Sequence, residues 1–257
     1  MPTPTSRGTL KLRSGRSGVL DEKGFTMWLE PVITAFALNA IAVDASPVTP
    51  LDHPVHAELA AESDWEHAYT SDAVVVYKKS LKSVDHIAWM GRTSLPETVS
   101  PAALLALLED TGSHAQYNRS LAASVVLDRT GGVTTFYQVV QTPNYVPLSD
   151  RWWIAQARNL HGADDPPARL RRIWATVPST EMPTVGAHLA TTYPKAIEIA
   201  FSAGRWELRP REDGSTEVIY CIVTDPGGAV PRSLSARFAG RSVSENLRAI
   251  LRSAENR

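Results

Sequence analysis

The stretch from Val218 to Arg252 constrains the fold more than any other part of the chain. β-Branched and aromatic residues over 218–223 predict a strand, and Pro226-Gly227-Gly228 predicts a turn after it. Pro231 follows where a proline can open a helix, because its missing N–H would have no intrahelical partner there. The apolar period then predicts one long helix over 232–253, with a buried stripe of Leu234, Ala236, Phe238, Gly240, Val243, Leu247, Ile250 and Ala254. Such a helix is about 33 Å long, so it must lie across a large apolar surface.

Gly240 lies in the middle of this buried stripe. A glycine at that point predicts either a close contact with the surface beneath or a bend in the helix. The opposite side of the helix carries Arg237, Arg241, Arg248 and Arg252. We interpret these arginines as a solvated face rather than as a contact for an anionic surface.

Charge and cysteine content narrow the functional classes. The 257 residues are 43% hydrophobic, which suits a globular protein with one large domain or two small ones. A net charge of −1 argues against a general nucleic-acid binder, which would carry a clustered excess of Lys and Arg. The single cysteine, Cys221, excludes an intrachain disulfide framework and a cysteine-based zinc site. We predict that it is a small buried hydrophobe within a strand.

The N-terminal part of the chain has the composition of a targeting segment. Its first 25 residues are polar and basic, and the apolar run over 31–43 has the length of a signal-peptide core but is too short to span a bilayer. We predict a basic tail and signal peptide over 1–45 and a linker over 46–56, hence a periplasmic or secreted protein. The alternative is a short amphipathic helix in a cytoplasmic protein. A start at Met27 would remove the basic region and favour that alternative.

Alternating helices and strands begin after the linker. We predict a helix over 57–69, strands over 73–79 and 87–93, and a helix that begins with Ser100 as N-cap, Pro101 as N1 and ends at Gly112. Further strands are predicted over 124–129, 133–141, 151–159, 169–177, 197–208 and 217–224, the first two joined by Thr130-Gly131-Gly132. Strands in series predict an antiparallel sheet, with the helices on one face, and therefore the α+β class. The stretch from Ser179 to Tyr193 is either an extension of two strands or a loop.

Several short motifs, taken in order, resemble a known family. They are Val74-Val75-Val76-Tyr77, Ser149-Asp150-Arg151, Gly204-Arg205-Trp206-Glu207-Leu208 with Pro210, Tyr220, Thr224-Asp225-Pro226-Gly227-Gly228 and Pro231. This set resembles the START domain, the steroidogenic-acute-regulatory-protein-related lipid-transfer domain, over about 57–257. The resemblance implies a helix-grip fold, in which a curved antiparallel sheet wraps around the C-terminal helix. It also implies a tunnel for one lipid, with that helix as its lid.

Alternation along the strands predicts which side chains would line such a tunnel. The candidates are Phe136, Gln138, Val140, Arg151, Trp153, Ala155, Trp206, Leu208, Val218, Tyr220 and Ile222 from the sheet, and Leu234, Phe238, Val243 and Leu247 from the helix. Each could equally be plain core. By position, Gln138 and Ala157 replace the carboxylate and arginine with which some START domains bind a lipid hydroxyl, so a cholesterol-like mode is in doubt. Gln138, Tyr220 and Arg151 remain as polar side chains that could contact a ligand. For Asp150 and Arg151 we favour the alternative that they only brace the start of the strand.

Catalytic and metal-binding patterns are scarce. The sequence has no G-x-S-x-G, P-loop or G-x-G-x-x-G motif, and Pro54 separates His53 from His56, the one histidine pair at helical spacing. We therefore predict a monomeric carrier or sensor of a lipid or other hydrophobic molecule, without enzymatic activity, cofactor or metal. Its partners would be that ligand and, transiently, a membrane surface. The alternative is a cyclase or aromatase that uses the same cavity.

Overall fold

The computed structural model describes residues 50–142, 148–160, 169–228 and 232–257, with residues 232–238 described as backbone only. The chain divides into two compact units, Met1–Ile41 and Ala42–Arg257. The first unit, the predicted signal peptide and residues 46–49 of the predicted linker lie outside the described residues, so export stays a prediction. No helix among the residues described is long and apolar enough to cross a membrane.

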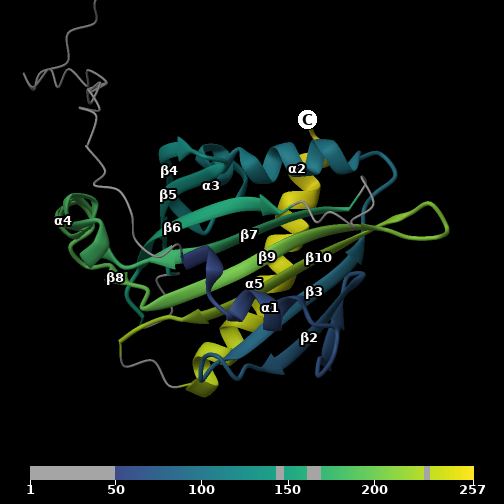
Figure 1. The fold of residues 1–257 in the computed structure, drawn as a ribbon, viewed down its shortest axis with the longest axis horizontal. Coiled ribbons are helices and arrows are strands. Elements are labelled where there is room, and N and C mark those ends of the chain that lie inside the picture. The colour runs from purple at the N-terminus through teal and green to yellow at the C-terminus, as the bar shows by residue number, and fades with distance from the viewer. Residues whose placement is uncertain (1–49, 143–147, 161–168, 229–231) are drawn as a thin grey trace, which may run out of the picture. The chain divides into compact units, whose positions relative to one another are not determined.

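One ten-stranded sheet organises the second unit (Figure 1). Its strands are β1 (Glu66–Ser71), β2 (Val74–Ser80), β3 (Ile87–Ser94), β4 (Leu121–Thr130), β5 (Val133–Val140), β6 (Arg151–Leu160), β7 (Leu170–Val177), β8 (Ile197–Glu198), β9 (Phe201–Pro210) and β10 (Thr216–Asp225). They pair in the order β1-β2-β3-β10-β9-β7-β6-β5-β4, antiparallel throughout, and the short β8 adds a parallel pairing to β6. The α+β prediction and the helix-grip arrangement are confirmed.

The helices are η1 (Pro50–Asp52), α1 (Val55–Ala60), α2 (Pro101–Glu109), η2 (Thr111–Ser113), α3 (His114–Tyr117), η3 (Ser179–Glu181), α4 (Pro183–Thr192) and α5 (Arg232–Glu255). The Ser100 Oγ accepts a hydrogen bond from the Ala103 N–H at 3.1 Å, so the predicted N-cap of α2 is confirmed. The hairpin between β4 and β5 turns at Gly131 and Gly132, whose φ angles of 59° and 77° suit glycine.

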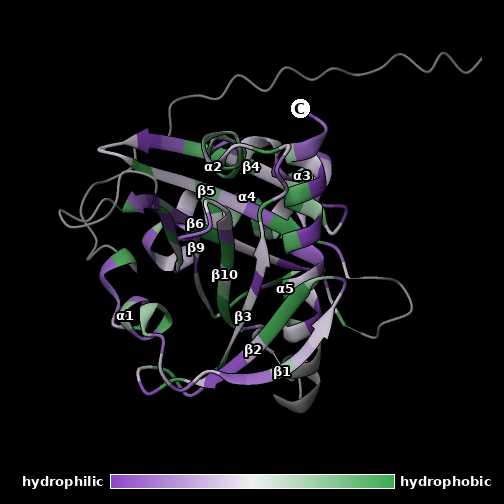
Figure 2. Cartoon of the chain, turned by 90° about the vertical axis from the view of Figure 1, so that its right-hand side faces the viewer, coloured by the Kyte–Doolittle hydropathy of each residue, from purple (hydrophilic) through white to green (hydrophobic). Residues whose placement is uncertain are grey.

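The long C-terminal helix α5 is confirmed, and it lies across the middle of the sheet against β2, β3 and β10 (Figure 1). Figure 2 shows both hydrophobic and hydrophilic residues along it, as expected for a helix with one buried face. A Cβ atom on Gly91 of β3 would lie 2.5 Å from Leu247 Cδ1 and 2.7 Å from Val243 Cγ1. The missing side chain at Gly91 therefore allows the helix to approach the sheet closely.

Gly240 is the matching contact on the helix. A Cβ atom there would lie 2.7 Å from the indole ring of Trp89, and the Tyr69 hydroxyl donates a 2.7 Å hydrogen bond to the Gly240 carbonyl. Of the two interpretations of this glycine, the structure supports close packing.

Three predicted element assignments are wrong. The helix predicted over 57–69 ends at Ala60, and the chain continues into β1, because Glu66 to Ser71 pair with β2. The strand predicted over 197–208 is two strands, β8 and β9. The stretch from Ser179 to Tyr193 is neither extended strands nor a loop, since it forms η3 and α4, whose Val185 and Leu189 are buried against Trp152 and Ile154.

The helices also do not share one face of the sheet. We call the face covered by α5 the inner face and the opposite one the outer face. Leu51, Val55 and Leu59, from η1 and α1, pack on the outer face with Ile219, Cys221 and their neighbours. Cys221 is fully buried there, as predicted, and burial raises the pKa of its thiol.

The outer face also holds a buried ion-pair network. The Glu207 side chain has no exposed surface and pairs with Arg205 at 2.9 Å, Arg209 at 2.9 Å and Arg169 at 2.7 Å. Burial alone would raise the pKa of Glu207, but these three arginines lower it. Glu217, 5% exposed, pairs in the same way with Arg92 and Arg211, both at 2.7 Å. Strand alternation places these carboxylates opposite the inner face but does not reveal that they are buried.

Candidate ligand-binding site

The inner face brings the predicted sheet residues together. Register places Val218, Tyr220 and Ile222 of β10 opposite Leu208, Trp206 and Gly204 of β9. Leu208, Val218 and Tyr220 form one hydrophobic cluster with Val243 and Leu247 of α5. Phe136 and Ala155 form an adjoining cluster, and Trp174 packs against both clusters. The predicted sheet residues therefore lie on one continuous face of the sheet, the face against which α5 packs.

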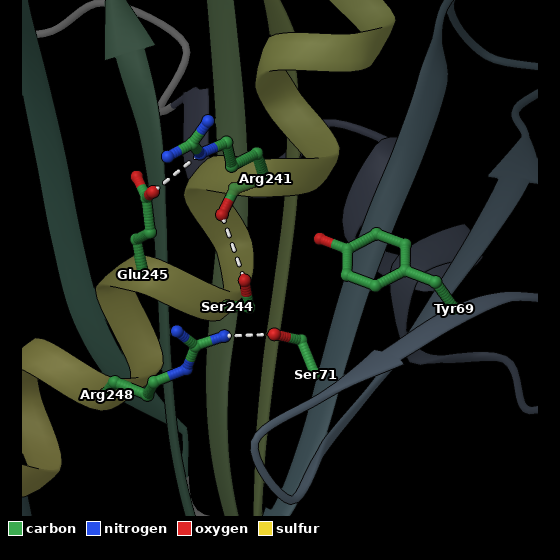
Figure 3. A pocket seen from close by; sticks show the side chains of 6 residues that line it. All are labelled: Tyr69, Ser71, Arg241, Ser244, Glu245 and Arg248. Atoms are coloured by element: carbon green, nitrogen blue, oxygen red, sulfur yellow. Dashed lines mark hydrogen bonds and ion pairs between the residues drawn. The ribbon is translucent and has the colours of Figure 1, made fainter.

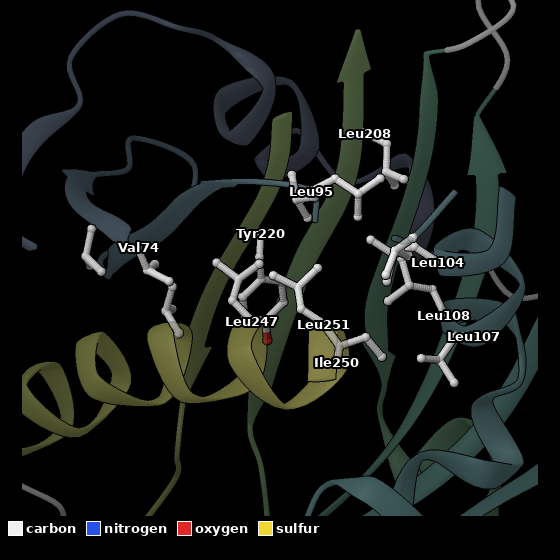
Figure 4. Packing of buried hydrophobic residues seen from close by; sticks show 14 of the residues in the cluster. Val74, Leu95, Leu104, Leu107, Leu108, Leu208, Tyr220, Leu247, Ile250 and Leu251 are labelled. Carbon is white, nitrogen blue, oxygen red and sulfur yellow. The ribbon is translucent and has the colours of Figure 1, made fainter. Parts of the chain in front are cut away.

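Leucines from α2 and α5 complete this cluster at one end. Figure 4 shows Leu104, Leu107 and Leu108 of α2 beside Ile250 and Leu251 of α5. All five side chains are buried, so this end of the space between sheet and helix is closed by protein.

Burial differs sharply among the inner-face side chains. Leu208, Val218, Val243 and Leu247 have no exposed surface, which is the environment of ordinary core. Trp153, Trp206 and Ile222 are only partly buried, although they lie on the covered face of the sheet. The partly exposed surface at these positions of the inner face is therefore aromatic and apolar, and it belongs to a few large side chains.

Three stacked rings form the centre of that surface. The Tyr220 ring lies 4.2 Å from the Trp206 ring and 5.7 Å from the Trp174 ring, centroid to centroid, with interplanar angles of 24° and 16°. Gly204 makes the stack possible, because a Cβ there would lie 2.1 Å from the Trp174 ring. Asn246 of α5 hydrogen-bonds the Tyr220 hydroxyl, and burial raises the pKa of that hydroxyl. The stack gives a flat, rigid wall that suits a hydrocarbon chain or ring system.

Gln138 belongs to a polar network beside this wall. Its Nε2 donates to Ser124 Oγ at 2.9 Å and lies 3.2 Å from His114 Nδ1, and Ser124 Oγ donates to the Thr111 carbonyl at 2.6 Å. His114 Nε2 lies 3.3 Å from the Leu108 carbonyl, which fixes the neutral tautomer with its proton on Nε2. Burial lowers the pKa of His114 to about 4. The network ties the segment after α2 to β4 and β5.

Arg172 of β7 is the inner-face residue that the sequence interpretation missed. It is 6% exposed, and its Nη1 donates to Asn159 Oδ1 at 3.0 Å. Asn159 in turn donates to the Glu109 carboxylate. The Nη2 of Arg172 has no hydrogen-bond partner, and burial lowers the pKa of the Arg172 guanidinium. The alternation of Leu170, Arg172, Trp174 and Thr176 along one strand face was a signal that could have identified it.

Arg151 makes the contacts of a brace. Its guanidinium donates to the backbone carbonyls of Pro226 at 2.7 Å and Ser149 at 2.6 Å. Asp150 accepts from the Thr142 N–H at 2.8 Å. The bond to Pro226 fastens the start of β6 to the Pro-Gly-Gly turn before α5, and the bond to Asp150 connects it to Thr142 after β5. A ligand contact by Arg151 stays a prediction.

The remaining predicted residues divide into two groups. Val140 lies on the inner face at the end of β5 and is partly buried. The side chains of Leu234 and Phe238 lie outside the described part of the chain, although both residues belong to α5. Whether any member of the predicted set contacts a ligand stays a prediction.

A polar groove of about 460 Å³ lies between α5 and the edge strand β1 (Figure 3). Its lining residues bind one another: Arg248 Nη2 donates to Ser71 Oγ at 2.8 Å, and Arg241 pairs with Glu245 at 2.8 Å. Arg248 also pairs with Asp72 at 3.1 Å. The Arg248 contacts fasten the helix to the sheet edge, so we interpret the groove as an attachment and not as the ligand site.

Metal-ligand geometry is absent from the residues that the structure describes, among which no three His, Cys, Asp or Glu side chains converge. His53 Nδ1 accepts a 3.1 Å hydrogen bond from the Val55 N–H and so caps the turn before α1. Burial lowers the pKa of His56 to about 4.

Comparison with known proteins supports the architecture. No family model matches the chain. It is 27% identical over 204 residues to the uncharacterized protein PA1579 of Pseudomonas aeruginosa, covering 77% of this chain and 90% of that protein. A STAR-related lipid transfer protein from Xanthomonas axonopodis is 21% identical, with a TM-score of 0.61 over 76% of this chain and 100% of the solved chain. Human StAR-related lipid transfer protein 5 is 11% identical, with a TM-score of 0.65 over 79% of this chain and 91% of that one. The chain has a START-like fold.

The same comparison corrects the prediction that the protein is not an enzyme. The Zhui aromatase/cyclase from Streptomyces matches with 13% identity and a TM-score of 0.47, over 66% of this chain and 94% of that one. Fold alone does not decide activity, so catalysis is not excluded. The absence of three sequence motifs argues only against the three common catalytic designs that use them, and not against enzymatic activity in general.

Proposed function

We propose that this START-like protein binds a single lipid or other hydrophobic molecule between the inner face of its sheet and α5. The observation that carries the proposal is the partly buried aromatic surface of Trp153, Trp174 and Trp206 on a face that a helix covers. Exposed apolar area in such a place is unfavourable in water and is covered when a ligand enters. Proteins named for StAR-related lipid transfer have the same fold, which agrees with this use.

The free energy of such binding needs no covalent chemistry. Each buried methylene contributes about 0.8 kcal/mol, so a covered apolar surface can compete with a bilayer for a long chain. In our proposal the protein carries or senses the bound molecule, and α5 acts as the lid. The part of α5 from Gly240 onward is packed on Gly91 and Trp89 and fastened to β1. Opening would therefore require these contacts to break, or would be confined to the helix before Gly240.

Native mass spectrometry tests the proposal directly. Protein purified from its own cell type, or incubated with liposomes and reisolated, should carry one hydrophobic molecule per chain. A Trp206→Glu variant puts a charge on the aromatic wall and should lose the adduct, whereas Trp65→Glu, a change on the outer face, should retain it. Wild-type protein that takes up nothing from either source would refute ligand binding.

A further inference from the structure

Arg172 is a cation enclosed where a hydrophobic ligand would lie. The residue opposite it in β9 is Trp206, and Trp174 follows two positions later on the same face of β7. Residues directly opposite in a sheet point to the same side, so the guanidinium and the aromatic wall belong to one surface. Its 6% exposure places it well inside the domain.

The protein itself satisfies only part of this guanidinium. The hydrogen bond from Nη1 to Asn159 is the one that the described residues supply, and through Asn159 it reaches the Glu109 carboxylate at the end of α2. Nη2 is buried without a partner. A purely structural brace would have its donors satisfied, because an unpaired buried N–H on a cation is expensive.

A second positive charge, that of Arg129, opposes the charged form of the Arg172 guanidinium. Arg129 donates to the Glu109 carbonyl at 3.3 Å, so the Glu109 region already serves a second arginine. His114 nearby is neutral and adds no charge. Glu109 favours the charged form of the Arg172 guanidinium, but burial and Arg129 oppose it and together outweigh Glu109, so an anionic oxygen would stabilise the cation.

We propose that Arg172 Nη2 binds an anionic oxygen at the polar end of the ligand, so that the ligand is an amphiphile with a carboxylate or phosphate group and an apolar part against Trp174 and Trp206. This inference rests on the proposed function and adds the chemical class of the ligand. Asn159 holds the guanidinium in place, and the partnerless nitrogen gives one oxygen-binding position. The orientation puts the headgroup in the interior rather than at the surface.

Three ligands of equal chain length test the proposal: tetradecanoate, tetradecyl phosphate and the neutral tetradecanol, each titrated against full-length protein by displacement of a neutral fluorescent naphthylamine probe. Wild-type protein should bind at least one of the two anions about ten- to a hundredfold more tightly than the alcohol, the range expected for a charged hydrogen bond. The stronger anion identifies the headgroup. Equal affinity for the anions and the alcohol would overturn the inference yet leave ligand binding intact, whereas no displacement by any of the three would count against the proposed function itself.

The variants Arg172→Met and Arg172→Gln separate recognition from bracing. Both should lower anion affinity to that of the alcohol, leave alcohol binding unchanged and keep or raise the melting temperature, because an undercompensated buried charge is removed. Arg171→Gln is the matched control, since its side chain is on the outer face of the same strand, and it should keep the anion preference. An anion preference that survives in either folded Arg172 variant would overturn the inference, as would an equal loss of anion and alcohol binding. The wild-type comparison remains decisive if neither variant folds.

Discussion

Stability should fall on mild acidification because His114 is buried in its neutral form. Its pKa is lowered from 6.5 to about 4, chiefly by burial. Its Nε2 proton faces the Leu108 carbonyl, so Nδ1 must accept from Gln138, and protonation would set two donors against each other. Between pH 6.5 and about pH 4 the native state therefore binds fewer protons at His114 than the unfolded state does. The free energy of unfolding decreases as the pH falls through that window.

The displacement of this pKa gives the size of the effect. Relative to pH 7.5, the contribution of His114 should decrease by about 1 kcal/mol at pH 5.5 and about 2–3 kcal/mol at pH 4.5. Urea unfolding of wild type and His114→Gln at these pH values measures it, because the other titrating groups are common to both proteins. The difference between the two proteins should shrink by those amounts on acidification. His67→Gln, which removes an exposed histidine, is the control. A wild-type minus His114→Gln difference that stays constant from pH 7.5 to 4.5 would refute the reasoning.

Three further outcomes are expected. Glu207→Gln should lower the free energy of unfolding by about 3 kcal/mol, since Arg205 keeps a buried charge without its partner, whereas Glu245→Gln removes an exposed pair and should cost about 0.5 kcal/mol or less in the same urea assay. Gly204→Ala should cost about 1–3 kcal/mol, because the new Cβ meets the Trp174 ring and the Cys221 carbonyl, while Gly112→Ala meets nothing closer than 3.9 Å and should be tolerated; equal melting temperatures for the two variants would contradict the stacking argument. Leu234→Glu or Phe238→Glu should abolish transfer of a fluorescent lipid between vesicles with the circular dichroism spectrum retained, and Arg252→Glu on the exposed face should not; unchanged transfer in the first two would remove the lid role.

Local patterns predicted elements wherever neighbouring residues determine the structure. The Ser100-Pro101 start of α2, the Gly-Gly hairpin and the apolar stripe of α5 each depend on residues within one or two turns. The 57–69 prediction failed because an apolar helical pattern over a few residues does not exclude pairing with a distant edge strand. β1 is held by β2, and only this pairing makes it a strand.

Strand alternation also placed most of the candidate site. It put Trp206 with Leu208, and Tyr220 with Val218, on the side that α5 covers, and the register confirms those faces. Alternation could not separate core from accessible surface. Leu208 is fully enclosed while Trp206 is not, because burial depends on how α2 and α5 close over different parts of one sheet.

The sequence by itself determined which side chains of each strand share a face, the long amphipathic helix and the need for an apolar surface beneath that helix. These features follow from periodicities of two and 3.6 residues. Only the tertiary structure decided that Gly91 and Gly240 are contacts between helix and sheet, that Glu207 is buried among arginines, and that Arg172 stands beside the aromatic wall with a nitrogen unpaired. Each of these depends on residues distant in the chain, whose distances no local pattern encodes.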